Sequence, residues 1–256
     1  MPKTPPRLPA SAALFVDFDG TLVALAQRPQ DVRVPEWVVP TLARLQHQLH
    51  GALAIVSGRP LAAIDAYLHP LVFAAAGEHG AERRDATGQL ERRRAQPPPD
   101  VVACAGTLVA RHPGLILEMK QSGFALHFRQ HPELGAGCLE SLSNALAQVP
   151  GAAFDWELLH GHCVFELKQR AVSKGTAVQA YLAERAFAGR LPVFVGDDAT
   201  DEDGIRAVQA AGGFGIRVGP GASQARYRLT DTDAVAAWLM HAAGESRVPV
   251  NKHHRA

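Results

Sequence analysis

Residues 12–21 read AALFVDFDGT, a short apolar run that ends in two aspartates and a Gly-Thr pair. The run 12–16 has no polar position, which is typical of a strand in a parallel sheet covered on both faces. Asp17 and Asp19 come where this strand should stop. Ligands of open parallel sheets bind at the carboxyl ends of the strands. The stretch therefore predicts a buried strand that brings two carboxylates to one edge of a sheet.

The chain on either side repeats this alternation of strand and helix. Apolar runs that predict further buried strands lie at 52–56, 71–76, 191–195 and 214–218. Helical spacing of apolar residues occurs between them, at 35–50, 61–68, 173–187, 201–211 and 232–243. Alternating strands and helices favour a doubly wound α/β core with a parallel sheet.

A different pattern interrupts this core. Residues 82–94 are charged and turn-like, and Pro97-Pro98-Pro99 cannot lie inside a helix or a central strand. Beyond them we expect a hairpin, a helix and two more strands, at 115–119 with 124–129, at 134–148, and at 153–157 and 162–167. The sequence thus predicts a split core, 1–90 and 169–256, with a smaller α+β cap inserted at 91–168.

Composition excludes several classes of function. The 256 residues carry a formal net charge of +1, so binding to nucleic acid through bulk charge is not expected. The three cysteines form no CxxC pair, which argues against a zinc site and fits a reducing cytoplasm. No apolar run reaches the length of a membrane helix or of a signal-peptide core. We expect a cytoplasmic protein with no membrane partner.

Three further polar clusters accompany the DFDGT stretch. Ser57-Gly58-Arg59 follows the second predicted strand, Gly196-Asp197-Asp198 follows a later one with Asp201 beyond it, and Lys174 opens the helix after the cap. Each cluster alone is typical of a turn, a helix cap or solvated surface. Their order around one predicted sheet favours a common site instead.

The chemistry of this set points to phosphoryl transfer. Asp17, Asp19 and Asp197 repel one another unless a cation relieves them, and Mg²⁺ prefers such oxygen ligands and bridges phosphate oxygens. A serine can donate to a phosphate oxygen, and a lysine can neutralise charge in the transition state. An aspartate can act as the nucleophile through an aspartyl-phosphate.

The motifs DFDGT, SGR, SKG and GDDATDED resemble, in this order, those of the haloacid dehalogenase superfamily of phosphatases. The resemblance implies that Asp17 is the nucleophile and that Asp19 is the general acid and then the general base. It implies that Ser57 and Lys174 hold the phosphoryl group. For Mg²⁺ it implies Asp17, the backbone carbonyl of Asp19, and Asp197, supported by Asp198 and Asp201.

The cap is similar to that of the trehalose-6-phosphate phosphatases within this superfamily, on the stretches 118–120, 125–129 and 165–168. The resemblance implies that four charged cap residues bind the sugar hydroxyls: Glu118, Lys120, Arg129 and Glu166. Gly58, Arg59 and His79 are further candidates for contact with the substrate. Phe128 replaces a tyrosine found in many relatives, and Gln169 replaces a common proline. Without the resemblance, an alternating charged strand is also typical of a solvated face.

We therefore expect a Mg²⁺-dependent phosphatase that acts on trehalose 6-phosphate, paired in function with a trehalose-6-phosphate synthase. The nearest alternative keeps the chemistry and changes the substrate to sucrose phosphate, mannosyl-phosphoglycerate or a hexose phosphate. A sugar-nucleotide glycosyltransferase would instead use the two acids of DFD as a metal clamp. A phospho-acceptor signalling domain would need neither Asp19 nor a cap.

Overall fold

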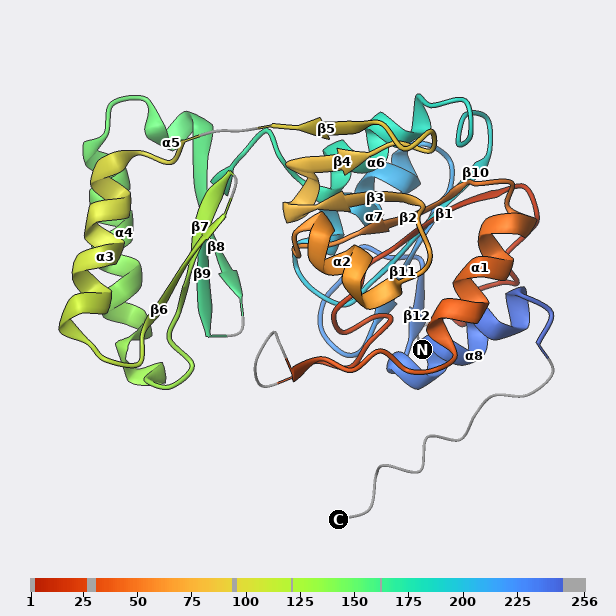
Figure 1. Cartoon of the computed structure of the whole chain (residues 1–256), viewed down its shortest axis with the longest axis horizontal. Coiled ribbons are helices and arrows are strands. Elements are labelled where there is room, and N and C mark those ends of the chain that lie inside the picture. The colour runs from red at the N-terminus through yellow and green to blue at the C-terminus, as the bar shows by residue number, and fades with distance from the viewer. Residues whose placement is uncertain (1–2, 27–30, 94–95, 121, 162, 246–256) are drawn as a thin grey trace, which may run out of the picture. The chain divides into compact units, whose positions relative to one another are not determined.

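A computed structural model describes residues 3–26, 31–93, 96–120, 122–161 and 163–245. The chain forms two compact units, coloured along the sequence in Figure 1. The first unit, the core, comprises Met1–Glu91 and Ser173–Ala256, and the second, the cap unit, comprises Arg92–Val172. The cap unit thus extends past the expected boundary at 168, because the last cap strand runs to Gln169 and the Arg170 amide donates to the carbonyl of Asp155 at 2.8 Å.

The core is built on one mixed sheet. Its order among the described residues is β12-β11-β10-β1-β2-β3-β4-β5, in which β4 runs antiparallel to β3 and the strands from β12 to β3 are parallel. The strands are β1 (Ala12–Val16), β2 (Leu53–Val56), β3 (Ala74–Gly77), β4 (Glu82–Arg84), β5 (Leu90–Arg92), β10 (Leu191–Gly196), β11 (Phe214–Val218) and β12 (Tyr227–Leu229). All five residues of β1 are buried, as a central strand between β10 and β2 requires.

Helices of the core pack in two pairs. The helix α1 (Val38–Gln48) packs on α8 (Thr232–Ala242), and α6 (Lys174–Leu182) packs on α7 (Asp201–Ala210), which also lies against β10 and β11 (Figure 1). The short helix α2 (Leu61–Leu68) lies against β3. Asp231 caps α8, since its carboxylate accepts from the amide of Ala234 at 2.8 Å. The doubly wound α/β core predicted from the sequence is confirmed.

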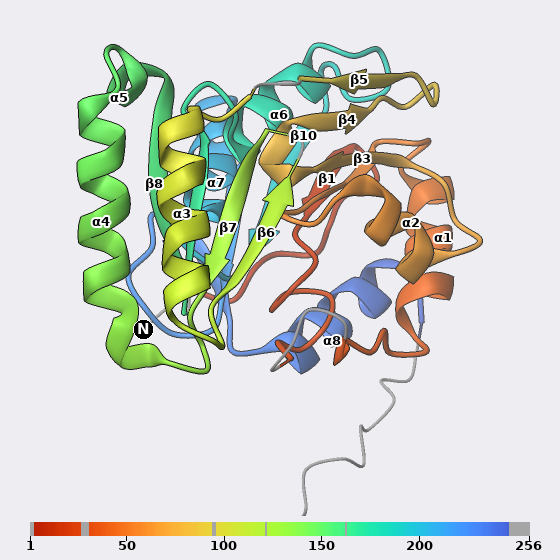
Figure 2. The same ribbon diagram turned by 60° about the vertical axis from the view of Figure 1, so that its left-hand side comes forward.

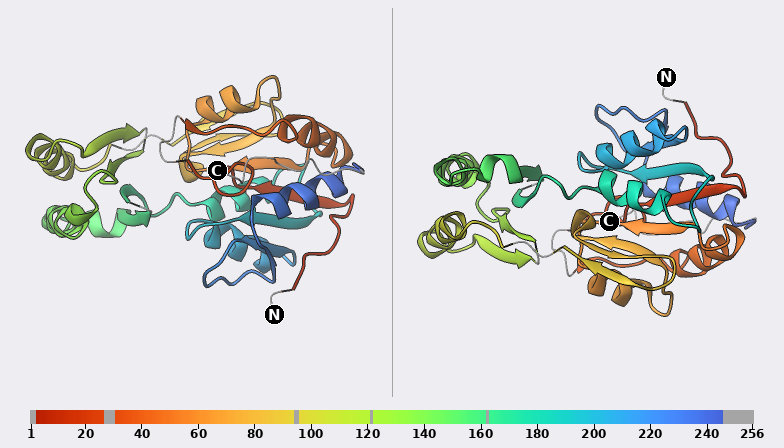
Figure 3. Two further views of the ribbon diagram at one scale, coloured as in Figure 1. Left: turned by 90° about the horizontal axis from the view of Figure 1, so that it is seen from below. Right: turned by 90° about the horizontal axis from the view of Figure 1, so that it is seen from above.

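The cap unit is a four-stranded antiparallel sheet in the order β6-β7-β9-β8. Its elements are α3 (Pro99–Arg111), β6 (Ile116–Lys120), β7 (Gly123–His127), α4 (Gly135–Gln148), α5 (Ala152–Asp155), β8 (Trp156–Gly161) and β9 (Val164–Gln169). Helices α3 and α4 run side by side and share a buried apolar cluster with one face of this sheet (Figure 2). Figure 3 shows the same unit from below and from above. The separate α+β cap that the sequence predicts is confirmed as a fold.

Two local predictions are wrong, and two elements were not predicted. Residues 82–94 contain β4 and β5. In β4 the charged side chains of Glu82 and Arg84 are buried and have partners, since Arg84 lies 2.6 Å from Asp65 and Glu82 accepts from the amide of Leu61, whereas β5 is the exposed strand at the end of the sheet. The helix α3 was not predicted; Pro99 is its first residue, where a missing N–H costs nothing, so no proline lies inside the helix. Residues 152–155 form α5, and the strand expected at 153–157 begins only at Trp156. The short strand β12 has no counterpart among the predicted elements.

Two parts of the sequence predictions lie outside the described residues: Gln121 in the expected hairpin turn and the start of the strand expected at 162. Within the described part of the chain, no helix combines the length and the apolar character needed to cross a membrane.

Candidate active site

The carboxyl ends of three neighbouring strands bring the motif residues to one edge of the core sheet. Asp17 continues β1, and its amide donates to the carbonyl of Val195 on β10 at 2.9 Å. Ser57 continues β2, and its amide donates to the carbonyl of Ala76 on β3 at 2.9 Å. Asp197 follows β10 directly. The parallel arrangement therefore places these residues as the sequence predicts.

Lys174 joins two of the acids in a buried ion cluster. Its Nζ lies 2.7 Å from Oδ1 of Asp17 and 2.7 Å from Oδ1 of Asp201. The side chains are 3%, 5% and 0% exposed, respectively. A buried charge without partners would be strongly unfavourable, so each member of the cluster depends on the others. The pKa of Lys174 is raised well above its usual range, because the charges of Asp17 and Asp201 outweigh the opposing effect of burial.

The SKG motif explains how Lys174 reaches this place. Ser173 and Thr176 form a reciprocal cap, in which each side-chain oxygen accepts from the other's amide at 3.1 and 3.0 Å. This N-terminal capping box of the helix makes Lys174 the first residue of α6, and the Lys174 side chain points inward. A Cβ on Gly175 would lie 2.7 Å from the carbonyl oxygen of Asp203, so only glycine lets α6 approach α7 this closely.

Asp201 organises the loop after β10. Its Oδ2 accepts from the amides of Asp197 at 2.9 Å and Asp198 at 3.0 Å. Asp198 in turn accepts through Oδ1 from the amide of Thr200 at 2.8 Å and the amide of Asp201 at 3.1 Å. Asp201 is thus engaged by the loop and by Lys174, whereas Asp197 stands at the loop's start with a long contact from the Thr21 hydroxyl, 3.4 Å from its Oδ1.

The acids at this edge fit a hard divalent cation. Asp17, Asp197 and Asp201 offer oxygen atoms that all lie within 4.8 Å of one another. Burial raises the pKa of Asp17 to about 7, with Asp197 and Asp198 adding to the rise and Lys174 opposing it. Burial, Asp201 and Asp198 raise the pKa of Asp197 to about 7. A bound cation would relieve this repulsion, and Mg²⁺ favours carboxylate oxygens.

Asp19 is held by Arg59. Its Oδ2 lies 2.6 Å from Nε of Arg59, and its Oδ1 lies 2.7 Å from Nη2, so the pair is bidentate. Arg59 stands after β2, and its amide also donates to Oγ of Ser57 at 3.1 Å. The structure therefore connects the second acid of DFDGT directly with the SGR motif, which the sequence did not predict.

Gly58 and His79 meet beside Ser57. The amide of His79 donates to the carbonyl of Ser57 at 2.9 Å, and a Cβ on Gly58 would lie 2.8 Å from Cε1 of the His79 ring. Only glycine leaves room for the ring. His79 also acts on Asp198: burial raises the pKa of Asp198, but Lys174, the Thr200 hydroxyl and His79 lower it to about 2. His79 thus lies at the edge that carries the acids.

The four predicted sugar ligands lie in the cap unit. Ala125 on β7 pairs with Glu118 on β6 and with Glu166 on β9, so the two glutamates occupy the same face of the sheet. Nζ of Lys120 lies 2.6 Å from Oε1 of Glu166. This charged face is the one turned away from the apolar cluster that α3 and α4 cover. Arg129 lies beyond the end of β7 and is exposed.

Three residues that lie near these sites were assigned no role from the sequence. His127 lies 2.9 Å from Oε2 of Glu118 through its Nε2. Arg217 donates from Nη1 to the carbonyl of Asp198 at 2.7 Å, and its position inside the buried strand FGIRV was a signal that could have been used. Gly20 has φ +77° and packs directly under Asp197.

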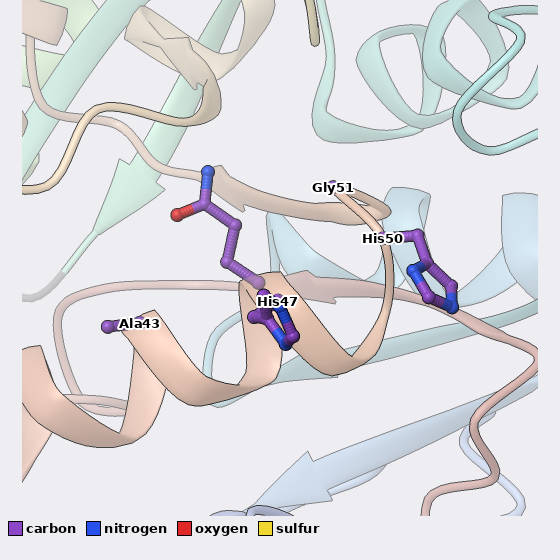
Figure 4. A pocket seen from close by; sticks show the side chains of 5 residues that line it. Ala43, His47, His50 and Gly51 are labelled. Atoms are coloured by element: carbon purple, nitrogen blue, oxygen red, sulfur yellow. The ribbon is translucent and has the colours of Figure 1, made fainter.

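A shallow depression lies elsewhere, at the C-terminal end of α1 (Figure 4). Ala43, Gln46, His47, His50 and Gly51 line it, and the rings of His47 and His50 stand apart in the view. It precedes β2 and so lies at the amino ends of the strands, opposite the edge that carries the acids. It has none of the groups that the acidic edge offers to a phosphate.

Comparison with known proteins identifies the family to which the chain is similar. The family model described as trehalose-phosphatase matches residues 15–233. The trehalose-6-phosphate phosphatase of Escherichia coli (strain K12) is 41% identical over 240 residues, which are 91% of this chain and 87% of the relative. A probable trehalose-phosphate phosphatase of Sinorhizobium fredii is 39% identical over 81% of this chain and 78% of its own length.

Solved structures show the same fold. The C-terminal domain of the trehalose-6-phosphate phosphatase of C. albicans has a TM-score of 0.80 at 21% identity, over 91% of this chain and 92% of that one. A haloacid dehalogenase-like hydrolase from Bacteroides thetaiotaomicron has a TM-score of 0.64 at 17% identity, over 89% and 98% of the two chains. The chain therefore belongs to the trehalose-phosphatase family, a family of phosphatases with the haloacid dehalogenase fold.

Proposed function

We propose that the protein is a Mg²⁺-dependent phosphatase that hydrolyses trehalose 6-phosphate through an aspartyl-phosphate. The observation that carries this proposal is the buried cluster of Asp17, Lys174 and Asp201, with Asp197 beside it, at the carboxyl edge of the sheet. A carboxylate in contact with an ammonium and with further acids suits nucleophilic attack on phosphorus assisted by a cation.

In the first step an oxygen of Asp17 attacks the phosphorus, and the bond from phosphorus to the sugar oxygen breaks. Asp19 gives its proton to that leaving oxygen, so trehalose departs and Asp17 carries the phosphoryl group. Lys174 has three N–H donors, and Asp17 and Asp201 accept two of them, which leaves one for an oxygen of the phosphoryl group. The hydroxyl of Ser57 supplies a second donor to the same group.

In the second step water attacks the phosphorus, and Asp19, now a carboxylate, takes a proton from that water. The bond between phosphorus and the Asp17 oxygen breaks, so phosphate leaves and the Asp17 carboxylate is restored. Asp201 does not react in either step. It holds Lys174 and the loop amides in place, which keeps Asp197 near Asp17.

For Mg²⁺ we propose Asp17, Asp197 and the carbonyl of Asp19 as ligands, with Asp198 and Asp201 in support. The hydrogen bonds of Asp201 to Lys174 and the loop fit a supporting role, since they leave less of its carboxylate for a cation. When bound, Mg²⁺ neutralises negative charge on the phosphate and on the attacking carboxylate.

For sugar recognition we propose the charged cap face with Glu118, Lys120 and Glu166, together with Arg129. Carboxylates and ammonium groups on one face offer acceptors and donors for several hydroxyl groups. A sugar that leaves them without partners is rejected. Gly58 and His79 stay as predicted contributors from the core, where His79 lies at the acidic edge. Arg59, the third predicted contributor, has its guanidinium on Asp19.

Pairing with a trehalose-6-phosphate synthase and a cytoplasmic location also belong to the proposal. A bifunctional trehalose-6-phosphate synthase/phosphatase of Thermoproteus tenax matches 85% of this chain within 30% of its own length. A synthase supplies the phosphate ester that the proposed reaction consumes, so the fused relative supports a functional pairing.

Phosphate release tests the reaction and its sugar. We expect trehalose 6-phosphate to be turned over far faster than sucrose 6-phosphate or glucose 6-phosphate, and only after Mg²⁺ is added to the EDTA-treated protein. Asp17→Asn should abolish turnover, while Asp31→Asn, on the exposed surface, serves as the matched control. Turnover by the Asp17→Asn variant near the wild-type rate, or preference for another sugar, would contradict the proposal.

A cap substitution tests recognition separately from chemistry. Glu166→Ala removes the partner of Lys120 and should lower kcat/KM for trehalose 6-phosphate about 10- to 100-fold, the worth of a hydrogen bond to a charged group. Turnover of a small phosphate ester should stay within about twofold. Glu140→Ala on α4, an exposed position of the same unit, is the control. Equal losses on both substrates would argue against a sugar-binding role.

A further inference from the structure

One guanidinium donates to both side-chain oxygens of Asp19, and each oxygen keeps a second lone pair for the proton that Asp19 gives and takes. The distances of 2.6 Å to Nε and 2.7 Å to Nη2 describe the fork-to-fork geometry that arginine, and not lysine, forms with a carboxylate. Two parallel hydrogen bonds restrict both the position of the carboxyl group and its rotation. The Arg59 side chain is 14% exposed and that of Asp19 is 29% exposed, so water competes only in part.

Arg59 is itself held firmly. Its guanidinium carbon lies 5.7 Å from the centre of the Phe18 ring and 5.1 Å from the centre of the Tyr67 ring. Its backbone is tied on both sides, because its amide donates to Oγ of Ser57 at 3.1 Å and its carbonyl accepts from the amide of Glu78 at 2.9 Å. Such contacts restrict a long side chain that would otherwise be mobile. They fix the Arg59 side chain between its own SGR loop and the DFDGT loop that carries Asp19.

We propose that Arg59 is the positioning residue of Asp19: it orients the carboxyl group that exchanges protons with the leaving sugar oxygen and with water. This inference rests on the proposed function, in which Asp19 is the general acid and base. It replaces direct contact with the substrate as the main role of Arg59. Arg59 then acts on the rate through Asp19 and not through binding of phosphate or sugar.

Two substrates whose leaving groups differ in basicity distinguish a role of Arg59 in positioning Asp19 from a role in binding phosphate or sugar. A sugar alkoxide leaves slowly without a proton, whereas 4-nitrophenolate leaves readily without one, so loss of a well-placed acid affects the first far more. A phosphate ligand would matter equally for both esters. A sugar ligand would change KM for trehalose 6-phosphate and not the rate of its first turnover.

The experiment compares wild type, Arg59→Gln, Arg59→Lys, Asp19→Asn and the double variant Arg59→Gln/Asp19→Asn, with Mg²⁺ present. Single-turnover release of trehalose and of 4-nitrophenolate is measured for each. We expect Arg59→Gln to slow trehalose release by about 10- to 100-fold and 4-nitrophenolate release by no more than about threefold. Arg59→Lys, which keeps the charge and loses the fork, should lie between wild type and Arg59→Gln.

The double variant provides the decisive comparison. If Arg59 acts through Asp19, Arg59→Gln should cause no further loss in the Asp19→Asn background. Additive losses, equal losses on the two esters, or a change in KM alone would overturn the inference. Thermal unfolding checks that the variants fold, and Arg59→Lys carries the test if Arg59→Gln does not. Absence of trehalose 6-phosphate turnover in the wild type would instead count against the proposed function.

Discussion

Replacement of Gly20 by alanine tests how closely the DFDGT loop fits the acid opposite. A Cβ at this position would lie 2.1 Å from Oδ2 and 2.3 Å from Cγ of Asp197. An ordinary contact of this kind is at least 3.4 Å, so the carboxylate has to shift by more than 1 Å. Gly20 also has φ +77°, a left-handed conformation that disfavours any side chain.

Two separable effects follow from this geometry. The left-handed backbone costs about 1–2 kcal/mol of unfolding free energy once a Cβ is present. For a chain of this size that corresponds to a fall in Tm of about 2–8 °C. The shift of the Asp197 carboxylate acts on activity, because a misplacement of about 1 Å in a catalytic site lowers the rate about 100-fold. Weaker Mg²⁺ binding should accompany the loss, since Asp197 is a proposed ligand.

Gly51→Ala is the matched control. Gly51 has φ +82°, and no atom beyond its chain neighbours lies within 4 Å of the position that a Cβ would take, so the substitution imposes the same backbone cost without touching the site. Thermal unfolding should show similar shifts for the two variants. Phosphate release from trehalose 6-phosphate, titrated with Mg²⁺, should fall about 100-fold in Gly20→Ala alone. Activity of Gly20→Ala within about twofold of Gly51→Ala would refute the argument that Asp197 must stay in this position.

Three further outcomes can be measured. In EDTA, the unfolding free energy of the wild type should rise relative to that of Asp17→Asn as the pH falls from 7.5 to 5. Burial raises the pKa of Asp17 to about 7, so the folded state binds a proton that the unfolded state does not yet bind. Urea titrations measure this, and the same pH dependence in both proteins would contradict it. Lys174→Met leaves Asp17 and Asp201 without their cation and should cost about 3–5 kcal/mol in urea unfolding at pH 7, and less at pH 5. Gly204→Ala should lower Tm, since its Cβ would lie 2.4 Å from the phenyl ring that faces it on β10, whereas Gly106→Ala, with open space on α3, should raise Tm slightly.

Local patterns were sufficient for the core of the fold. Apolar runs such as 12–16 have to be covered on both faces, and the polar residues that follow them have to lie at the carboxyl edge of a parallel sheet. The family resemblance of four ordered motifs added the expected chemistry. The helix beginning at Pro99 was missed because proline is tolerated at the first position of a helix. The strands at 82–84 and 90–92 were missed because charged residues also occur in an end strand and, where folding gives them partners, in a buried one.

The sequence by itself determined which residues stand at the ends of the strands, since that follows from short-range alternation and chain direction. Only the tertiary structure decided their partners. Nothing in the sequence connects Asp19 with Arg59 or Lys174 with Asp201, because those contacts depend on which strands are neighbours and how α6 enters the sheet edge. Hydrogen bonds and ion pairs act over about 3 Å, so the chemistry of a carboxylate is settled by the side chain that folding brings against it.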